Sequence, residues 1–66
     1  MLHWPVADVA AFFESKDPGA LGNSLAANSV QGKDLLRFTV ESLKKDLNFN
    51  TFAAQKICDL RDEFLS

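Results

Sequence analysis

One stretch, from Asn28 to Leu43, constrains the fold more than any other part of the chain. It contains a break at Gly32, a compact apolar group after it, and Thr39, a residue type that often caps a helix. The apolar group consists of Leu35, Leu36 and Phe38. Because the segment 33–37 has room for only one or two helical turns, we predict a short helix that fills the core. A further helix is expected from Val40 to about Leu47.

Helical periodicity before this stretch predicts two more helices. Residues at i, i+3, i+4 and i+7 form one apolar face over 5–15, and Pro5 suits the first turn. Of the adjacent Phe12 and Phe13, one is expected to be deeply buried and the other partly exposed. The apolar face comprises Val6, Val9, Ala10 and Phe13.

Asp17 and Pro18 predict the cap and the start of a second helix over about 18–28. Gly19 and Gly22 each cost roughly 1 kcal/mol relative to alanine in a helix interior, so tertiary packing must hold this segment. Asn28 is expected to be its left-handed C-terminal residue.

The last helix is expected to begin after a cap at Asn50 or Thr51 and to be the longest. Its inward residues recur at i, i+4, i+7 and i+11 up to the C-terminus, and they are Ala53, Ile57, Leu60 and Phe64. No stretch alternates with the period of two that a strand requires. The sequence therefore predicts an all-α fold: one five-helix domain over residues 1–66, which we expect to be part of a larger protein.

Composition excludes several functional classes. Cys58 is the single cysteine, so no internal disulfide can form, and a reducing location in the cytoplasm or nucleus is expected. We expect neither a signal peptide nor a membrane-spanning segment. His3 and Cys58 stand at opposite ends of the chain and there is no glycine-rich phosphate loop, so we expect no enzyme activity, cofactor or metal site. Cys58 is expected to be a half-buried small side chain rather than a reactive thiol.

The ordered pattern resembles the sterile alpha motif (SAM) domain, a five-helix bundle. The resemblance covers essentially the whole chain, and its strength lies in the order and spacing of many weak signals. These are Trp4, Val9, Phe12-Phe13, Leu21, Leu25, Asn28-x-Val30-x-Gly32, Leu35-Leu36-x-Phe38-Thr39, Leu43, Leu47, Lys56-Ile57 and Leu60.

Three positions depart from the SAM pattern. Asn48 stands where the family often has glycine, and asparagine tolerates left-handed geometry, so the turn is expected to survive. Pro18-Gly19 stands where leucine is common. The last helix opens with 53–56, Ala-Ala-Gln-Lys, where many members have a Gly-His-Arg-like basic segment, and this difference affects a binding surface.

The resemblance implies a protein–protein interaction module of a scaffold or signalling protein, which pairs with another SAM domain, either a second copy or a different one. Such pairing joins two surfaces. The mid-loop surface would comprise Asp34, Glu41 and Asp46, and the end-helix surface Asn50, Thr51, Phe52, Ala53, Ala54, Gln55 and Lys56. We expect a contact that depends more on Phe52, small alanines and the helix dipole than on salt bridges.

Binding of an RNA hairpin, known for part of the family, is the alternative. It would need scattered cations to converge on one face, against nine acidic residues and a net charge of −2. The sequence therefore argues against nucleic acid as the partner. The cations are Lys16, Lys33, Lys44, Lys45, Lys56 and Arg61.

Overall fold

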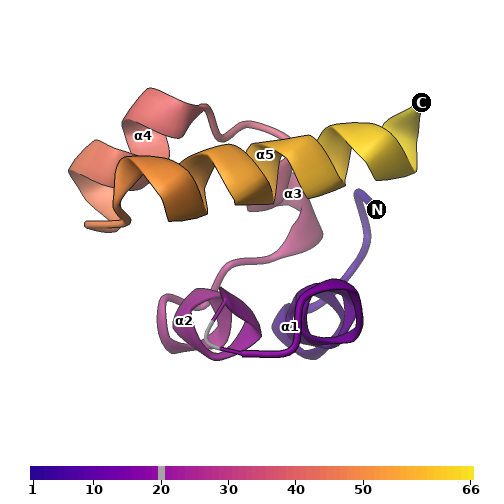
Figure 1. Cartoon of the computed structure of the whole chain (residues 1–66). Coiled ribbons are helices and arrows are strands. Elements are labelled where there is room, and N and C mark those ends of the chain that lie inside the picture. Colours follow the sequence, from indigo (N-terminus) through magenta and orange to yellow (C-terminus); the bar gives the residue numbers. More distant parts are fainter. Residues whose placement is uncertain (20) are drawn as a thin grey trace.

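A computed structural model describes residues 1–19 and 21–66 of the chain, and these form five α-helices and no strands. The helices are α1 (Val6–Lys16), α2 (Leu21–Ala27), α3 (Gly32–Leu35), α4 (Val40–Asp46) and α5 (Thr51–Leu65). In Figure 1, α1 and α2 form one layer, α4 and α5 form another, and α3 lies between them. This confirms the predicted all-α fold with a long C-terminal helix. No helix in the described ranges is long and apolar enough to cross a membrane.

The core fills the space between the two layers. Phe13, Leu25, Leu35, Leu43 and Ile57 are its largest fully buried residues, and every helix contributes one of them. Phe13 is fully buried while Phe12 is partly exposed, as predicted. The short α3 therefore does fill the core, through Leu35.

Side-chain caps set the boundaries of α4 and α5. The backbone amide of Ser42 donates to the Thr39 hydroxyl at 3.1 Å, and the Thr39 amide donates to the Ser42 hydroxyl at 2.9 Å. The amide of Ala53 donates to Oδ1 of Asn50 at 2.7 Å. Each bond satisfies a donor that a helix N-terminus leaves free. The predicted caps Thr39 and Asn50 are thus confirmed.

The predicted start of α2 is wrong, and so is the residue predicted to be left-handed at its C-terminal end. The expected helix over 18–28 included position 20, which lies outside the described residues, and α2 begins only at Leu21. Gly19 has a φ of +158°, which no helix contains. At the C-terminus, Ser29 rather than Asn28 is left-handed, with a φ of 55°. The amide of Val30 then donates to the Leu25 carbonyl at 3.1 Å, which closes a Schellman motif.

The left-handed turn after α4 depends on Asn48, whose φ is 60°. The amide of the following residue, Phe49, donates to the Leu43 carbonyl at 3.2 Å. The turn therefore survives the replacement of glycine by asparagine, as expected.

The buried face of α5 is rotated from the predicted one. Ala54, Ile57 and Cys58 are buried, whereas Phe64 is 47% exposed. The ring of Phe64 packs at the edge of the core, with its centroid 5.1 Å from that of Trp4. Phe64 was predicted to point into the core. It is instead about half exposed and packs at the edge of the core, so this prediction is only partly correct.

Gly22 lets α1 and α2 approach closely. A Cβ atom at position 22 would lie 2.7 Å from the backbone oxygen of Ala10, closer than real Cβ atoms come to such an atom. Gly22 is itself buried. The glycine that weakens α2 as an isolated helix is therefore required for its packing against α1.

We predict that Gly22→Ala lowers the free energy of unfolding by about 1–2 kcal/mol. Overpacking costs typically 1–3 kcal/mol, and it outweighs the gain of roughly 1 kcal/mol in helix propensity. Urea unfolding followed by circular dichroism measures the change. Asn23→Ala, at an exposed position of the same helix, is the control and should be neutral or stabilising. A Gly22→Ala variant as stable as the control would contradict the close packing of α1 and α2.

Candidate functional site

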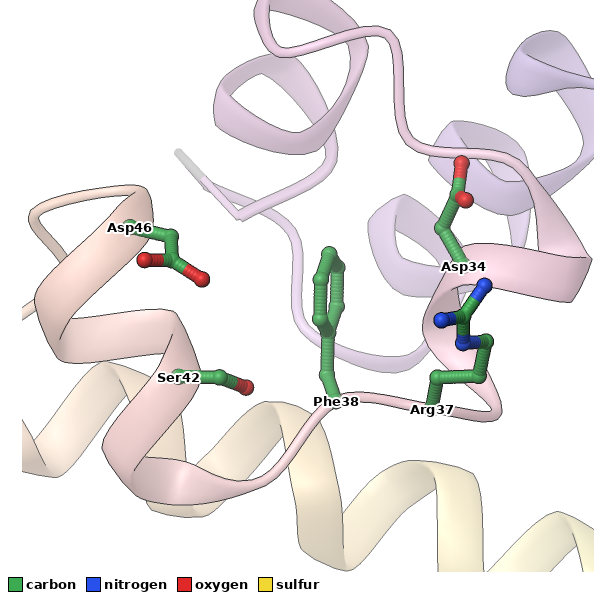
Figure 2. Close-up of a pocket in the computed structure, with 5 residues that line it drawn as sticks. All are labelled: Asp34, Arg37, Phe38, Ser42 and Asp46. Atoms are coloured by element: carbon green, nitrogen blue, oxygen red, sulfur yellow. The ribbon is translucent and has the colours of Figure 1, made fainter.

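An open pocket of about 220 Å³ lies between α3 and α4. We call it the mid-loop pocket, and its lining residues are Asp34, Arg37, Phe38, Ser42 and Asp46. Figure 2 shows the ring of Phe38 standing between Asp34, which comes from α3, and Asp46, which comes from α4. The pocket therefore combines a partly buried aromatic surface, carboxylates on two sides and one guanidinium, that of Arg37.

Two of the three predicted mid-loop acids meet at this pocket. Asp34 and Asp46 line it, whereas Glu41 lies in the first turn of α4, is exposed, and is not among the lining residues. Glu41 therefore belongs to the neighbouring surface of α4 and not to the pocket itself.

Asp34 also has a structural role. Its Oδ2 accepts a hydrogen bond from the backbone amide of Gln31 at 3.1 Å, at the N-terminus of α3. This bond fixes the carboxylate and competes with any external donor. Asp46 lies at the last position of α4 and is exposed, so its carboxylate is the more accessible of the two.

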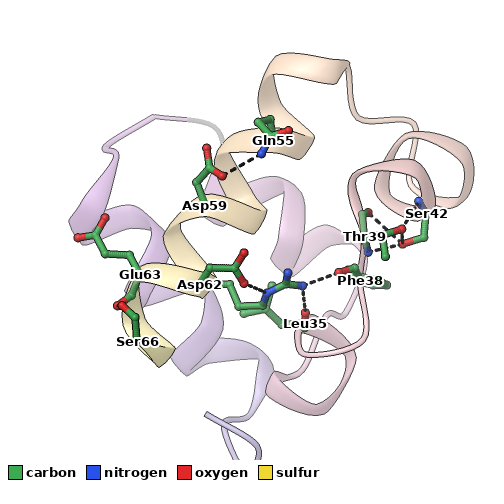
Figure 3. A network of polar contacts seen from close by, with 10 residues as sticks. Leu35, Phe38, Thr39, Ser42, Gln55, Asp59, Asp62, Glu63 and Ser66 are labelled. Atoms are coloured by element: carbon green, nitrogen blue, oxygen red, sulfur yellow. Dashed lines mark hydrogen bonds and ion pairs between the residues drawn. The ribbon is translucent and has the colours of Figure 1, made fainter.

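Arg61 of α5 fixes the backbone at Leu35 and at Phe38, the aromatic residue that lines the pocket. Its Nη1 donates to the backbone oxygens of Leu35, at 3.1 Å, and of Phe38, while its Nε pairs with Asp62 at 2.9 Å. Figure 3 shows the polar contacts that connect α5 to Leu35 and Phe38. A guanidinium is well suited to this place because a helix C-terminus leaves carbonyl oxygens without partners. Arg61 is more than 20 residues away from both acceptors in the sequence, so local sequence patterns do not predict this contact.

The end-helix surface lies at the first turns of α5. Thr51, Phe52 and Gln55 are exposed there, and Phe52 is 76% exposed, the largest exposed fraction among the large hydrophobic residues described. Asn50 caps the helix and Ala53 is partly buried. Ala54, however, is fully buried in the core, so its prediction as a binding residue is wrong.

Lys56 is the only cation of the end-helix surface, and it already has two neighbours. Its Nζ lies 3.1 Å from Oδ1 of Asp17, in the segment between α1 and α2. The same Nζ lies 5.7 Å from the centroid of the Phe52 ring, at cation–π distance. Gln55 in turn donates to Asp59 at 2.8 Å. The surface is therefore apolar at Phe52 and nearly neutral around it.

Cys58 is buried deeper than the half-buried position predicted for it. Burial raises the pKa of its thiol above the usual value, although the positive charge of Arg61 acts in the opposite direction. A buried thiol with a raised pKa has little thiolate at neutral pH, so Cys58 is a packing residue.

The comparison with solved structures identifies the fold. A structure described as the hetero SAM domain structure of Ph and Scm superposes on this chain with a TM-score of 0.87 and 28% sequence identity. The match covers 97% of this chain and 98% of the other. The chain therefore has the fold of a SAM domain, in agreement with the resemblance seen in its sequence.

Comparisons at the level of sequence add nothing to this result. No family model matches the chain, and no curated protein matches it either.

Proposed function

We propose that this SAM domain is a protein–protein interaction module that associates head to tail. The end-helix surface of one copy would bind the mid-loop pocket of the next, and the same surfaces would serve for pairing with a different SAM domain. The similar solved structure is a hetero SAM domain structure, which supports pairing between SAM domains. The module would act within an intracellular scaffold or signalling protein, where its single thiol stays reduced.

One observation carries the proposal: the chain presents an exposed aromatic side chain and, at a separate place, a pocket suited to receive it. Phe52 is 76% exposed beside Lys56, while the pocket offers the ring of Phe38 between two carboxylates. Aromatic anchors in pockets dominate the binding energy of many interfaces. Lys56 would lie near Asp46 of the neighbouring copy, which sets the orientation.

The proposed contact joins two different patches, so it does not close on itself. A heterologous interface of this kind generates open chains when the rotation between copies does not close a ring. The free N–H groups at the N-terminus of α5 carry partial positive charge, which would attract the carboxylates of the neighbouring pocket. We therefore expect oligomers that grow with concentration.

The RNA-binding alternative receives less support from the positions of its six cations. Lys56 pairs with Asp17, and Arg61 is held by two carbonyl oxygens and Asp62. These two cations are engaged within the domain. Contacts to phosphates require clustered cations that are available to the ligand.

We predict that Asp46→Lys weakens self-association about tenfold, which corresponds to about 1.4 kcal/mol. The variant reverses a charge at the pocket rim without disturbing the Asp34 cap of α3. Static light scattering over a concentration series at low salt measures the average mass. Glu63→Lys makes the same charge change on an exposed residue near the end of α5 and should behave like the wild type. A wild type that stays monomeric throughout the series would refute self-association.

A further inference from the structure

We propose that Asp17 is a specificity-determining residue of the end-helix surface, because it occupies Lys56 and so lowers the affinity of that surface for acidic pockets. This inference rests on the proposed function. Asp17 lies outside the predicted site, in the segment that joins α1 to α2. Its Oδ1 lies 3.1 Å from the Nζ of Lys56, the only cation between Asn50 and Lys56.

The pair is positioned to compete with a partner. The side chains of Lys56 and Asp17 are 37% and 33% exposed, so both charges are partly withdrawn from water and yet reachable. The same ammonium group lies 5.7 Å from the Phe52 ring centroid. Lys56 is therefore close both to the carboxylate of Asp17 and to the aromatic side chain that would enter the neighbouring pocket.

An acidic partner must overcome two electrostatic costs at this surface. Its carboxylate has to share or displace Asp17 at the Lys56 ammonium group, and Asp17 itself repels that carboxylate. A partner with an apolar, uncharged pocket bears neither cost. Unfavourable charge pairs are a general means of rejecting one partner in favour of another.

Asp17 also disfavours the binding of a second copy of this domain. Its mid-loop pocket is lined by two carboxylates, those of Asp34 and Asp46, and by the one guanidinium of Arg37, so a second copy presents a net negative charge, which Asp17 disfavours. Asp17 would therefore keep self-association weak and leave the end-helix surface free for a SAM domain whose pocket carries less negative charge.

The test compares Asp17→Asn with Asp8→Asn by sedimentation velocity. Both variants remove one negative charge from α1 or its end, but Asp8 lies in the first turn of α1 and is exposed. We expect Asp17→Asn to tighten self-association roughly two- to fivefold at low salt, the range of one surface ion pair, and Asp8→Asn to change it much less. The gain in affinity should largely disappear when the salt concentration is raised from about 0.1 M to about 0.5 M, because salt screens exposed charges. Thermal unfolding of both variants verifies that they are folded.

The outcomes separate this inference from the proposed function. A Phe52→Glu variant, which lacks the aromatic side chain of the end-helix surface, tests the head-to-tail contact itself. Equal association of Asp17→Asn and Asp8→Asn, together with a monomeric Phe52→Glu variant, would overturn the role of Asp17 and leave the head-to-tail contact standing. Weaker association of Asp17→Asn would also overturn it, because Asp17 would then contribute a favourable contact. If neither variant nor the wild type associates at any concentration, both proposals are wrong.

Discussion

Phe52→Glu is expected to abolish self-association over the concentration range in which the wild type forms oligomers. Phe52 is 76% exposed on the first turn of α5, so the substitution removes little from the fold. It does remove the proposed anchor of the contact, and anchors of this type cost 2 kcal/mol or more when truncated, about 30-fold in affinity. The new carboxylate would also face the acids of the mid-loop pocket. Light scattering, with sedimentation velocity as a second method, measures the effect.

Leu65→Glu is the matched control for this prediction. It places the same charge at an exposed apolar residue of the same helix, 13 residues from Phe52, or about 20 Å along the axis. We expect Leu65→Glu to associate like the wild type. Equal loss of association in both variants would indicate a general effect of negative charge and would argue against a specific role for Phe52.

Phe13→Ala is expected to lower the free energy of unfolding by about 3–5 kcal/mol. Truncating a buried phenylalanine costs about 3–5 kcal/mol, and Phe13 is fully buried between the layers. A domain of this length has a free energy of unfolding of only about 3–10 kcal/mol, so the loss removes much or all of it. Urea or thermal unfolding followed by circular dichroism measures the change.

Phe52→Ala provides the comparison for the core prediction. It deletes the same atoms from an exposed position, where surface substitutions usually change stability by less than about 0.5 kcal/mol. If Phe13→Ala retained the stability of Phe52→Ala, the assignment of Phe13 to the centre of the core would be wrong.

Local signals in the sequence predicted the five helices well. Thr39 and Asn50 cap their helices because each oxygen satisfies a free amide three residues ahead, a purely local event. The start of α2 was predicted wrongly from the local signal at Asp17 and Pro18. The carboxylate of Asp17 forms an ion pair with Lys56, which lies 39 residues away in the sequence, and a local pattern does not report such a contact.

The buried face of α5 shows what periodicity misses. The pattern gave most weight to large apolar residues such as Phe64, whereas the helix turns Ala54 and Cys58 toward the core. A pattern that ranks residues by apolar size therefore misses small side chains that face the core. The same limit hid the role of Gly22, which depends on the backbone of Ala10 in another helix.

The candidate site was predictable in part. The acids Asp34 and Asp46 and the exposed Phe52 follow from the resemblance to the SAM pattern and from the helical wheel. The role of Arg61 could not be predicted in this way, because its hydrogen-bond acceptors are the backbone oxygens of Leu35 and Phe38, far from it in the sequence. Such long-range polar contacts depend on how the layers meet.

The central claim, a head-to-tail contact between two different surfaces, is tested most directly by mixing two variants that are each blocked on one side. Phe52→Glu keeps an intact mid-loop pocket, and Asp46→Lys keeps an intact end-helix surface. Phe52→Glu alone should be monomeric, and Asp46→Lys alone should form oligomers only at about tenfold higher concentration than the wild type. Below that concentration, but where the wild type forms oligomers, an equimolar mixture should consist mainly of a 1:1 heterodimer. A mixture that stays monomeric while the wild type forms oligomers under the same conditions would contradict the head-to-tail contact.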